Sequence, residues 1–134
     1  MSKIEFEHLK GAVIYNIYEG LSKHDNNDAL YFDTSIGKFI MTHYQDCCEG
    51  VGIEDIVGDP RDVCHTEILL AEEVTDGDYG PDWSQTWTYY KLATVLGDLS
   101  IRWIGESNGY YSESVDFQSC KWKEPPGKVL QGSD

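Results

Sequence analysis

The sequence predicts a β-rich α+β domain, built as an antiparallel bent sheet or a small barrel with one or two short helices. About seven or eight short segments are rich in β-branched and aromatic residues. Turn-forming Asn, Asp and Gly separate these segments, and helical apolar periodicity is almost absent. At 134 residues, we expect one compact domain over residues 1–122 and a loosely ordered tail over residues 123–134.

The first part of the chain predicts a strand followed by a hairpin. Residues 11–19 are β-branched and aromatic, which favours a strand. Residues 24–28 form a turn cluster, because Asn and Asp accept left-handed backbone and bond to their own main chain. Residues 29–33 and 38–44 then predict two paired strands around Ser35-Ile-Gly37.

The middle of the chain predicts one helical turn between strands. Residues 51–57 are expected to be a short strand or turn. Asp59 before Pro60 is typical of an N-cap followed by proline at the first helical position, so a helical turn is predicted over 60–64. Residues 65–73 predict another strand, which ends in an acidic loop over 75–82.

The last part of the chain predicts strands over residues 87–94 and 99–105. A final hairpin is expected to pair Ile101 with Val115 through a three-residue loop ending at Gly109. That register places the apolar residues of both strands on one face, whereas a slip of one residue would separate them. Gly109 would take the left-handed position of the turn, which suits a residue without Cβ.

The charge balance limits the partners that the chain can bind directly. Ten Lys and Arg stand against 24 Asp and Glu, a formal charge of −14. Such a chain is repelled by the phosphates of nucleic acid and by anionic membranes. The apolar runs are too short to span a bilayer, and the N-terminal residues lack the apolar core of a signal peptide. We therefore expect an intracellular protein.

The acidic residues are concentrated in the middle of the sequence. Residues 46–82 contain 12 Asp or Glu and one base, Arg61, a charge of −11. Two interpretations stay open: a solvated surface that keeps the protein soluble, or a negative face that imitates nucleic acid and docks on a basic groove. For the second, we expect the contacts with the partner to come from five residues: Glu72, Glu73, Asp76, Asp78 and Asp82.

One short segment has the residue types of a metal site. His43, Cys47 and Cys48 could converge on a structural zinc ion, since imidazole and thiolate are the ligands that zinc prefers. Adjacent cysteines seldom both face one metal, so a further ligand is expected from a carboxylate or thiol nearby: Asp46, Glu49, Cys64, His65 or Glu72. The alternatives are a buried thiol pair beside a hydrogen-bonded histidine, or a catalytic metal. A disulfide is not expected in a reducing cytosol.

Other polar residues give weaker indications. Glu106 and Glu113 flank the turn after residue 105 and could be a general acid and base, while Arg102 is expected to pair with a neighbouring carboxylate. Aromatic residues near that turn could form a patch for protein recognition or fill the core. The sequence has no phosphate-binding glycine loop and no serine nucleophile motif, so an enzyme is not expected.

Four motifs resemble a small domain family of unknown function that occurs in bacteriophages, prophages and other mobile elements. The motifs are His43-Tyr-Gln-Asp-Cys-Cys-Glu49, Ile53-Glu-Asp-Ile-Val-Gly-Asp59, Thr86-Trp-Thr-Tyr-Tyr90 and Arg102-Trp-Ile-Gly-Glu-Ser-Asn-Gly-Tyr-Tyr-Ser-Glu113, and the short segment Ala71-Glu-Glu73 also agrees. The resemblance runs from about Gly11 to Phe117, departs from the family pattern at residues 63–66, and implies no reaction. In size and charge the chain also resembles anti-CRISPR proteins, some of which inhibit the nuclease Cas9.

These resemblances, with the acidic segment, lead to one expected function. The protein is expected to be a non-enzymatic inhibitor that acts in the cytoplasm of a bacterial host. It would bind a host defence protein, most specifically a Cas9-type nuclease, and block nucleic acid loading. The alternatives are a metal-dependent hydrolase, or a binding protein for small nucleotide signals that uses Arg102 and the aromatic turn.

Overall fold

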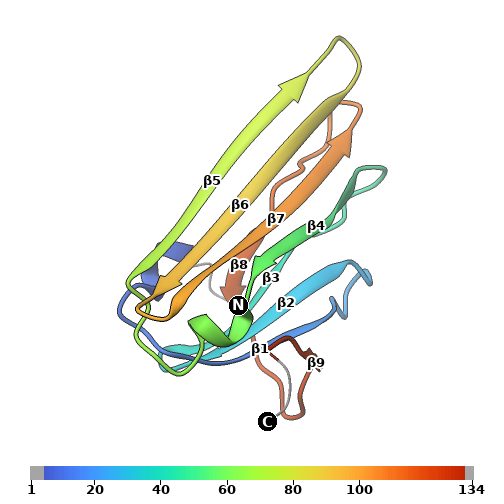
Figure 1. Ribbon diagram of the computed structural model, residues 1–134. Helices are drawn as coiled ribbons and strands as arrows, with labels where there is room; N and C mark the ends of the chain where they lie inside the picture. Colours follow the sequence, from blue (N-terminus) through green and yellow to red (C-terminus); the bar gives the residue numbers. More distant parts are fainter. Residues whose placement is uncertain (1–4, 132–134) are drawn as a thin grey trace.

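A computed structural model describes residues 5–131 and shows two antiparallel sheets packed face to face (Figure 1). The five-stranded sheet has the order β8-β3-β2-β1-β9, and the four-stranded sheet has the order β4-β7-β6-β5. In chain order the strands are β1 (Ile14–Leu21), β2 (Asp28–Thr34), β3 (Gly37–Thr42), β4 (Gly50–Gly58), β5 (Leu70–Tyr79), β6 (Ser84–Thr94), β7 (Gly97–Ser107), β8 (Asp116–Ser119) and β9 (Gly127–Val129).

Two single 3₁₀ turns are the only helical elements among the described residues: η1 (Phe6–Leu9) and η2 (Pro60–Val63). The antiparallel, β-rich architecture is confirmed, but the helical part of the expected α+β class is reduced to these two turns. The sheets also do not close into a barrel over residues 5–131, since β4, β5, β8 and β9 are left as edge strands. No helix in this range is long and apolar enough to cross a membrane.

The main core lies between the two sheets. Trp103 of β7 is fully buried, and its indole N–H points to the Met41 sulfur of β3 at 3.3 Å. Phe6 of η1 closes one end of the core, with its ring edge-on to Tyr90 and Phe117. Aromatic pairs in this geometry add stability beyond the burial of their area.

The outer face of the five-stranded sheet carries a second, smaller core. Tyr18, Ala29, Tyr31 and Ile40 are buried there, and Trp122 and Val129 of the C-terminal segment pack against them. β9 lies within the tail that was expected to be loosely ordered, and it pairs with β1 through Tyr18↔Val129 and Gly20↔Gly127. The expected division between a compact domain and a tail at residue 122 stays a prediction. Residues 1–4 of the expected domain and residues 132–134 of the expected tail lie outside the described residues.

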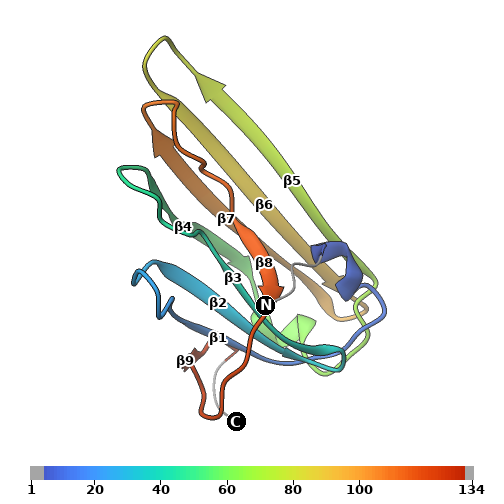
Figure 2. The same ribbon diagram turned by 180° about the vertical axis from the view of Figure 1, so that it is seen from behind.

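The far ends of β5 and β6 extend beyond the five-stranded sheet (Figures 1 and 2). We call residues 72–88, which comprise most of β5, the β5–β6 turn and the first part of β6, the arm. After Ala71, every residue of β5 is exposed on both sides of the strand. The exposed strand β5 therefore depends on its backbone hydrogen bonds to β6, and β6 is itself paired with β7 along its whole length.

Several local expectations are confirmed. The hairpin of β2 and β3 turns at residues 35–36, with Thr34 opposite Gly37. Asp59 caps η2 by accepting a hydrogen bond from the Arg61 N–H at 3.0 Å, and Pro60 begins the turn. Strands over 87–94 and 99–105 form the paired β6 and β7. Each of these depends on a few residues close in sequence.

The predicted final hairpin is wrong. β7 already has β6 on one side and β4 on the other, so neither of its edges is open to residues 115–117. β8 instead pairs with β3 in the opposite sheet, with Met41 opposite Phe117. Val115 and Phe117 are buried, as their alternation predicted, but a buried face can pack against either sheet. Gly109 does have a positive φ, of 95°.

The predicted acidic loop over 75–82 is also wrong in its first part, because β5 continues to Tyr79. Strand alternation between apolar and polar residues is absent here, since both sides of the strand face solvent. The aromatic and β-branched residues of β6 supply the partner strand instead. The strand predicted over 65–73 accordingly begins five residues later, at Leu70.

Two glycines with positive φ should differ in their sensitivity to substitution. Gly58 has φ 111° and lies so close to β7 that an added Cβ would overlap the Asp98 carbonyl oxygen, whereas Gly109 has φ 95° and open space around it. We expect Gly109→Ala to lower the free energy of unfolding by about 1–2 kcal/mol, the cost of the backbone conformation alone. Gly58→Ala should cost about 3 kcal/mol or more, because steric overlap is added. Urea unfolding of the two variants measures this, and equal losses would contradict the packing at Gly58.

Candidate functional site

The segment between β3 and β4 holds a buried histidine and a buried glutamate that contact each other. His43 directly follows β3, Glu49 directly precedes β4, and both side chains are almost fully buried. The His43 Nε2 lies 2.8 Å from Glu49 Oε2, and its Nδ1 lies 2.7 Å from the Ser114 carbonyl oxygen. Both ring nitrogens thus face oxygen atoms, so the ring is held from two sides.

The Glu49 carboxylate also organises the backbone of this segment. The N–H groups of Asp46 and Cys47 donate to its two oxygens at 2.7 and 2.9 Å. Desolvation acts to raise the pKa of Glu49, but these backbone hydrogen bonds and the one from His43 outweigh it and lower the pKa to about 2. Glu49 is therefore a charged anchor around which residues 43–49 fold.

The same segment is tied to the turn between β1 and β2. The Gln45 N–H donates to Asp25 Oδ2 at 2.9 Å, and the Asn27 side chain donates to the His43 carbonyl at 3.2 Å. The Asn27 amide also donates to Gln45 Oε1 at 3.0 Å. Burial alone would raise the pKa of Asp25, but hydrogen bonds from the Gln45 and Asn27 backbones lower it.

The predicted zinc ligands lie in this segment, but they are not arranged as a preformed metal site. Both nitrogens of His43 are engaged in hydrogen bonds, while Cys47 and Cys48 are exposed and joined by a disulfide. Of the other ligands considered, Glu49 binds His43, and Cys64 lies in the main core, where burial raises its pKa to about 11. Over residues 5–131, no three His, Cys, Asp or Glu side chains are placed to hold a metal ion together. The structure gives zinc no support, and zinc binding stays a prediction.

Half of the acidic residues of the stretch 46–82 lie on the two edge strands of one sheet. Glu54 and Asp55 lie on β4, whereas Glu72, Glu73, Asp76 and Asp78 lie on β5, and β7 and β6 separate these two strands. Arg102 of β7 pairs with the β4 group, at 2.6 Å from Glu54 Oε1 and 3.9 Å from Asp55 Oδ2. The expected ion pair of Arg102 with a carboxylate is confirmed, and this side of the sheet is partly neutralised.

The acidic side chains of the arm, unlike those of β4, have no arginine close by in the sheet. Residues 70–83 contain five acidic residues and no Lys or Arg. Lys91 lies opposite Glu72 in the register of β5 and β6, and its ammonium is 3.8 Å from Asp98. All five predicted contact residues, Glu72, Glu73, Asp76, Asp78 and Asp82, therefore lie together on the arm and are exposed.

The two glutamates considered as a general acid and base lie on opposite faces of the four-stranded sheet. Glu106 accepts a hydrogen bond from the Gln85 amide at 2.7 Å. Glu113 accepts hydrogen bonds from the hydroxyls of Ser84, Ser107 and Thr86, the last at 2.9 Å. Successive residues of a strand point to opposite faces, so the two carboxylates cannot act on one substrate.

Aromatic side chains gather at the end of the arm. A cavity of about 660 Å³ lies between the β5–β6 turn and the loop after β7, and Tyr79, Trp83 and Tyr110 line it. Tyr79 and Tyr110 are 77% and 88% exposed, so these rings do not fill the core. The arm thus combines an acidic strand with exposed aromatic rings at its tip.

The stability of the protein should depend on the ionised form of Glu49 at low pH. The pKa of Glu49 is about 2 when folded and 4.5 ordinarily, so the unfolded chain takes up the proton first as pH falls. The stabilisation is complete above pH 4.5 and is lost between about pH 4.5 and 2. Glu49→Gln should flatten the fall of unfolding free energy over this range, measured by urea unfolding at several pH values. Glu67→Gln, at an exposed carboxylate elsewhere, is the control, and equal pH dependence of the two variants would contradict this role of Glu49.

The zinc prediction is tested by metal analysis of protein purified without chelators and under reducing conditions. If His43, Cys47 and Cys48 hold zinc, about one ion per chain is expected, and chelation should lower stability. His43→Ala should then lose the metal. A zinc content well under half an equivalent would show that the buried pair with Glu49 is the only role of His43.

The comparisons with known proteins give a family but no activity. A family model described as a domain of unknown function, DUF7448, matches residues 6–117. No curated protein and no solved structure matches the chain. The matched range runs from η1 into β8 and includes the segment 43–49, the arm and the whole four-stranded sheet. Because the match covers most of the chain, the protein belongs to the DUF7448 family.

Proposed function

We propose that this protein is a non-enzymatic inhibitor whose acidic arm binds a basic surface of a host protein that handles nucleic acid. The observation that carries the proposal is the arm itself: five exposed acidic residues on an extension of the fold, with no base in residues 70–83. A charged projection of this kind can enter a groove that a flat surface could not reach. The proposed target is a defence protein, most specifically a Cas9-type nuclease.

The spacing of the acidic residues supports imitation of nucleic acid. Glu72, Asp76 and Asp78 are separated by even numbers of positions. Because successive residues of a strand point to opposite faces, the three lie on the same face of β5. Neighbouring positions on one face of a strand are about 7 Å apart, so Asp76 and Asp78 are neighbours in this row of negative charge, and Val74 separates them from Glu72. Such a row attracts a lysine- and arginine-lined channel from a distance and speeds association.

The edge of β5 is open along the arm. At its beginning, the Glu73 N–H donates to Glu7 Oε2 of η1 at 2.9 Å. The outward backbone groups farther along, at Thr75, Gly77 and Tyr79, make no hydrogen bond within the described part of the chain. Acidic side chains also keep such an edge from pairing with other strands, a role that needs no partner. Salt-dependent binding distinguishes the two roles.

The proposed mechanism is obstruction. When the arm occupies a positively charged channel, guide or target nucleic acid cannot load, because both compete for the same basic side chains. The exposed Tyr79, Trp83 and Tyr110 would add apolar contact near the tip, as aromatic residues do at protein interfaces. We place this activity in the cytoplasm of a bacterial host that a phage or other mobile element has entered. Inhibition would be stoichiometric, with no catalytic step.

Neutralising the arm should weaken inhibition without unfolding the protein. The variant Glu72→Gln/Asp76→Asn/Asp78→Asn removes three exposed charges and leaves Glu73 and its contact with Tyr90 intact. We expect association with the target to slow by about tenfold or more at low salt, since attraction over the Debye length of about 10 Å is lost. Titration of a Cas9 cleavage reaction at two salt concentrations measures this, beside capture of partners from a bacterial lysate.

The matched control is Glu5→Gln/Glu19→Gln/Glu67→Gln, which changes net charge equally at exposed sites outside the arm. It should inhibit as the unmodified protein does. Unchanged cleavage at a large molar excess of inhibitor would eliminate a Cas9-type target. A captured partner that binds the arm variant and the control equally well would eliminate the role of the arm.

A further inference from the structure

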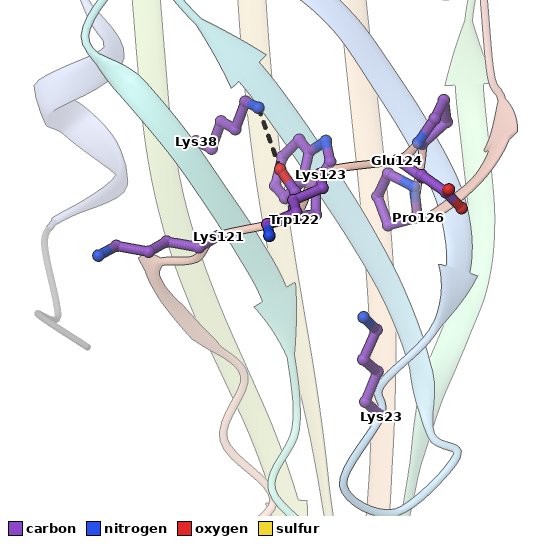
Figure 3. Close-up of a pocket in the computed structure, with 8 residues that line it drawn as sticks. Lys23, Lys38, Lys121, Trp122, Lys123, Glu124 and Pro126 are labelled. Atoms are coloured by element: carbon purple, nitrogen blue, oxygen red, sulfur yellow. Dashed lines mark hydrogen bonds between the residues drawn. The ribbon is translucent and has the colours of Figure 1, made fainter.

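Four of the ten basic residues line one cavity at the C-terminal end of the molecule (Figure 3). The cavity has a volume of about 930 Å³ and lies between the segment 121–126, the β1–β2 turn and β3. Lys23 extends from the turn toward the C-terminal segment, and Lys38 reaches it from β3 (Figure 3). Lys121 and Lys123 flank Trp122 in the sequence and line the same cavity.

Trp122 is held in place as the wall of this cavity. Its carbonyl accepts a hydrogen bond from Lys38 Nζ at 3.3 Å, and the same ammonium lies 5.0 Å from the centre of its ring. Tyr31 and Tyr18 meet the ring edge-on, at centroid distances of 5.6 and 6.2 Å. The pairing of β9 with β1 anchors the chain just beyond. The wall is therefore positioned before any ligand arrives.

A smaller recess of about 120 Å³ adjoins the cavity. Tyr31, Ile40, Tyr44 and Trp122 line it, which makes its surface mainly aromatic and apolar. Lys23 and Lys121 line both spaces, and Lys23 extends toward the C-terminal segment whereas the end of Lys121 points away from Trp122 (Figure 3). If the aromatic ring of a ligand lay in the recess, an anionic group attached to that ring would lie near the lysines of the larger cavity.

The cavity is positive in a protein of strongly negative charge. Its lining contains four lysines and one carboxylate, Glu124. Within residues 5–131, no carboxylate lies within 4.0 Å of the ammonium groups of Lys23, Lys38, Lys121 or Lys123. Lysines that are gathered in this way attract an anion, and a concave wall strengthens the local field.

We infer that this cavity binds a nucleoside phosphate as a free nucleotide. The lysines, Lys23 and Lys38 above all, would hold the phosphates, and the base would lie against Trp122 and the tyrosines of the recess. The volume is in the range of small-molecule sites, about 300–1,000 Å³. A nucleic acid strand fits less well, because its length would meet the negative charge of the rest of the chain. This inference does not rest on the inhibitor function proposed above.

The acidic arm of a second copy is the other occupant that charge alone would allow. The arm is the edge of a four-stranded sheet, because β6 pairs with β7 as well as with β5, whereas the aromatic recess holds about 120 Å³ and suits one ring. The recess is thus the observation that favours a small aromatic anion. Sedimentation of the unmodified chain tests the alternative, and self-association that Lys23→Gln abolishes would overturn the nucleotide assignment.

The direct test is calorimetric titration of the full chain with ATP, GTP, CTP and UTP. At least one should bind at a single site with a Kd below ~1 mM. Adenosine or the matching nucleoside, and tripolyphosphate, should each bind about tenfold more weakly, because each lacks half of the recognition. Binding of none of the four nucleotides up to ~1 mM would overturn the inference.

Variants locate the site. Lys23→Gln/Lys38→Gln should weaken nucleotide binding by about tenfold or more, whereas Lys10→Gln/Lys91→Gln, which removes the same charge outside the cavity, should not. Lys23 is exposed on a turn, so Lys23→Gln alone keeps the test valid if loss of Lys38 unfolds the protein. Equal affinity of the two double variants would place the nucleotide elsewhere and overturn the assignment. Tighter binding of an oligothymidylate than of any nucleotide would overturn it in favour of a strand.

Discussion

The packing of two sheets of unequal length is the constraint on which the rest of the molecule depends. β6 and β7 have 11 residues each, about 36 Å of strand, whereas β2 and β3 have seven and six. Apolar residues such as Trp103 and Leu92 occupy the part of the long strands that the short sheet can cover. Beyond that part, Glu113 of the loop after β7 covers Thr86 on the inner face, and the outer strand β5 carries exposed polar and acidic side chains. The arm is a direct consequence.

The charges of the protein follow the same division. The acidic β5 lies at the end of the fold that extends into solvent, and Arg102 neutralises part of the acidic β4 edge. Lysines gather at the opposite end, where the C-terminal segment covers the outer face of the five-stranded sheet. Although the net charge is −14, the protein has a negative surface on the arm and a positive one at the lysine-lined cavity. Because fields fall off within about 8–10 Å at moderate salt, each surface can attract its own kind of partner.

In the segment 43–49, the position of Glu49 determines what His43 binds. His43 with Cys47 and Cys48 has the composition of a zinc site, and Glu49 was only one of several further ligands considered. In the fold, the Glu49 carboxylate receives His43 and two backbone N–H groups, which accounts for its low pKa. The alternative to zinc was a buried thiol pair beside a hydrogen-bonded histidine. His43 is buried and hydrogen-bonded, but Cys47 and Cys48 are exposed, so only the part of that alternative about the histidine agrees with the structure.

The local features could be predicted from the amino-acid sequence: the β2–β3 hairpin, the η2 turn capped by Asp59, the β6–β7 strands and the acidic character of residues 72–82. Each depends on residues within a few positions of one another, where turn chemistry and strand propensity decide. The folded molecule alone shows that β8 joins β3, that acidic residues lie on both β4 and β5, and that Lys23 and Lys38 line one cavity with Trp122. Alternation marks a buried face but not the sheet that covers it, and the sequence around a surface lysine does not indicate which distant residues lie beside it.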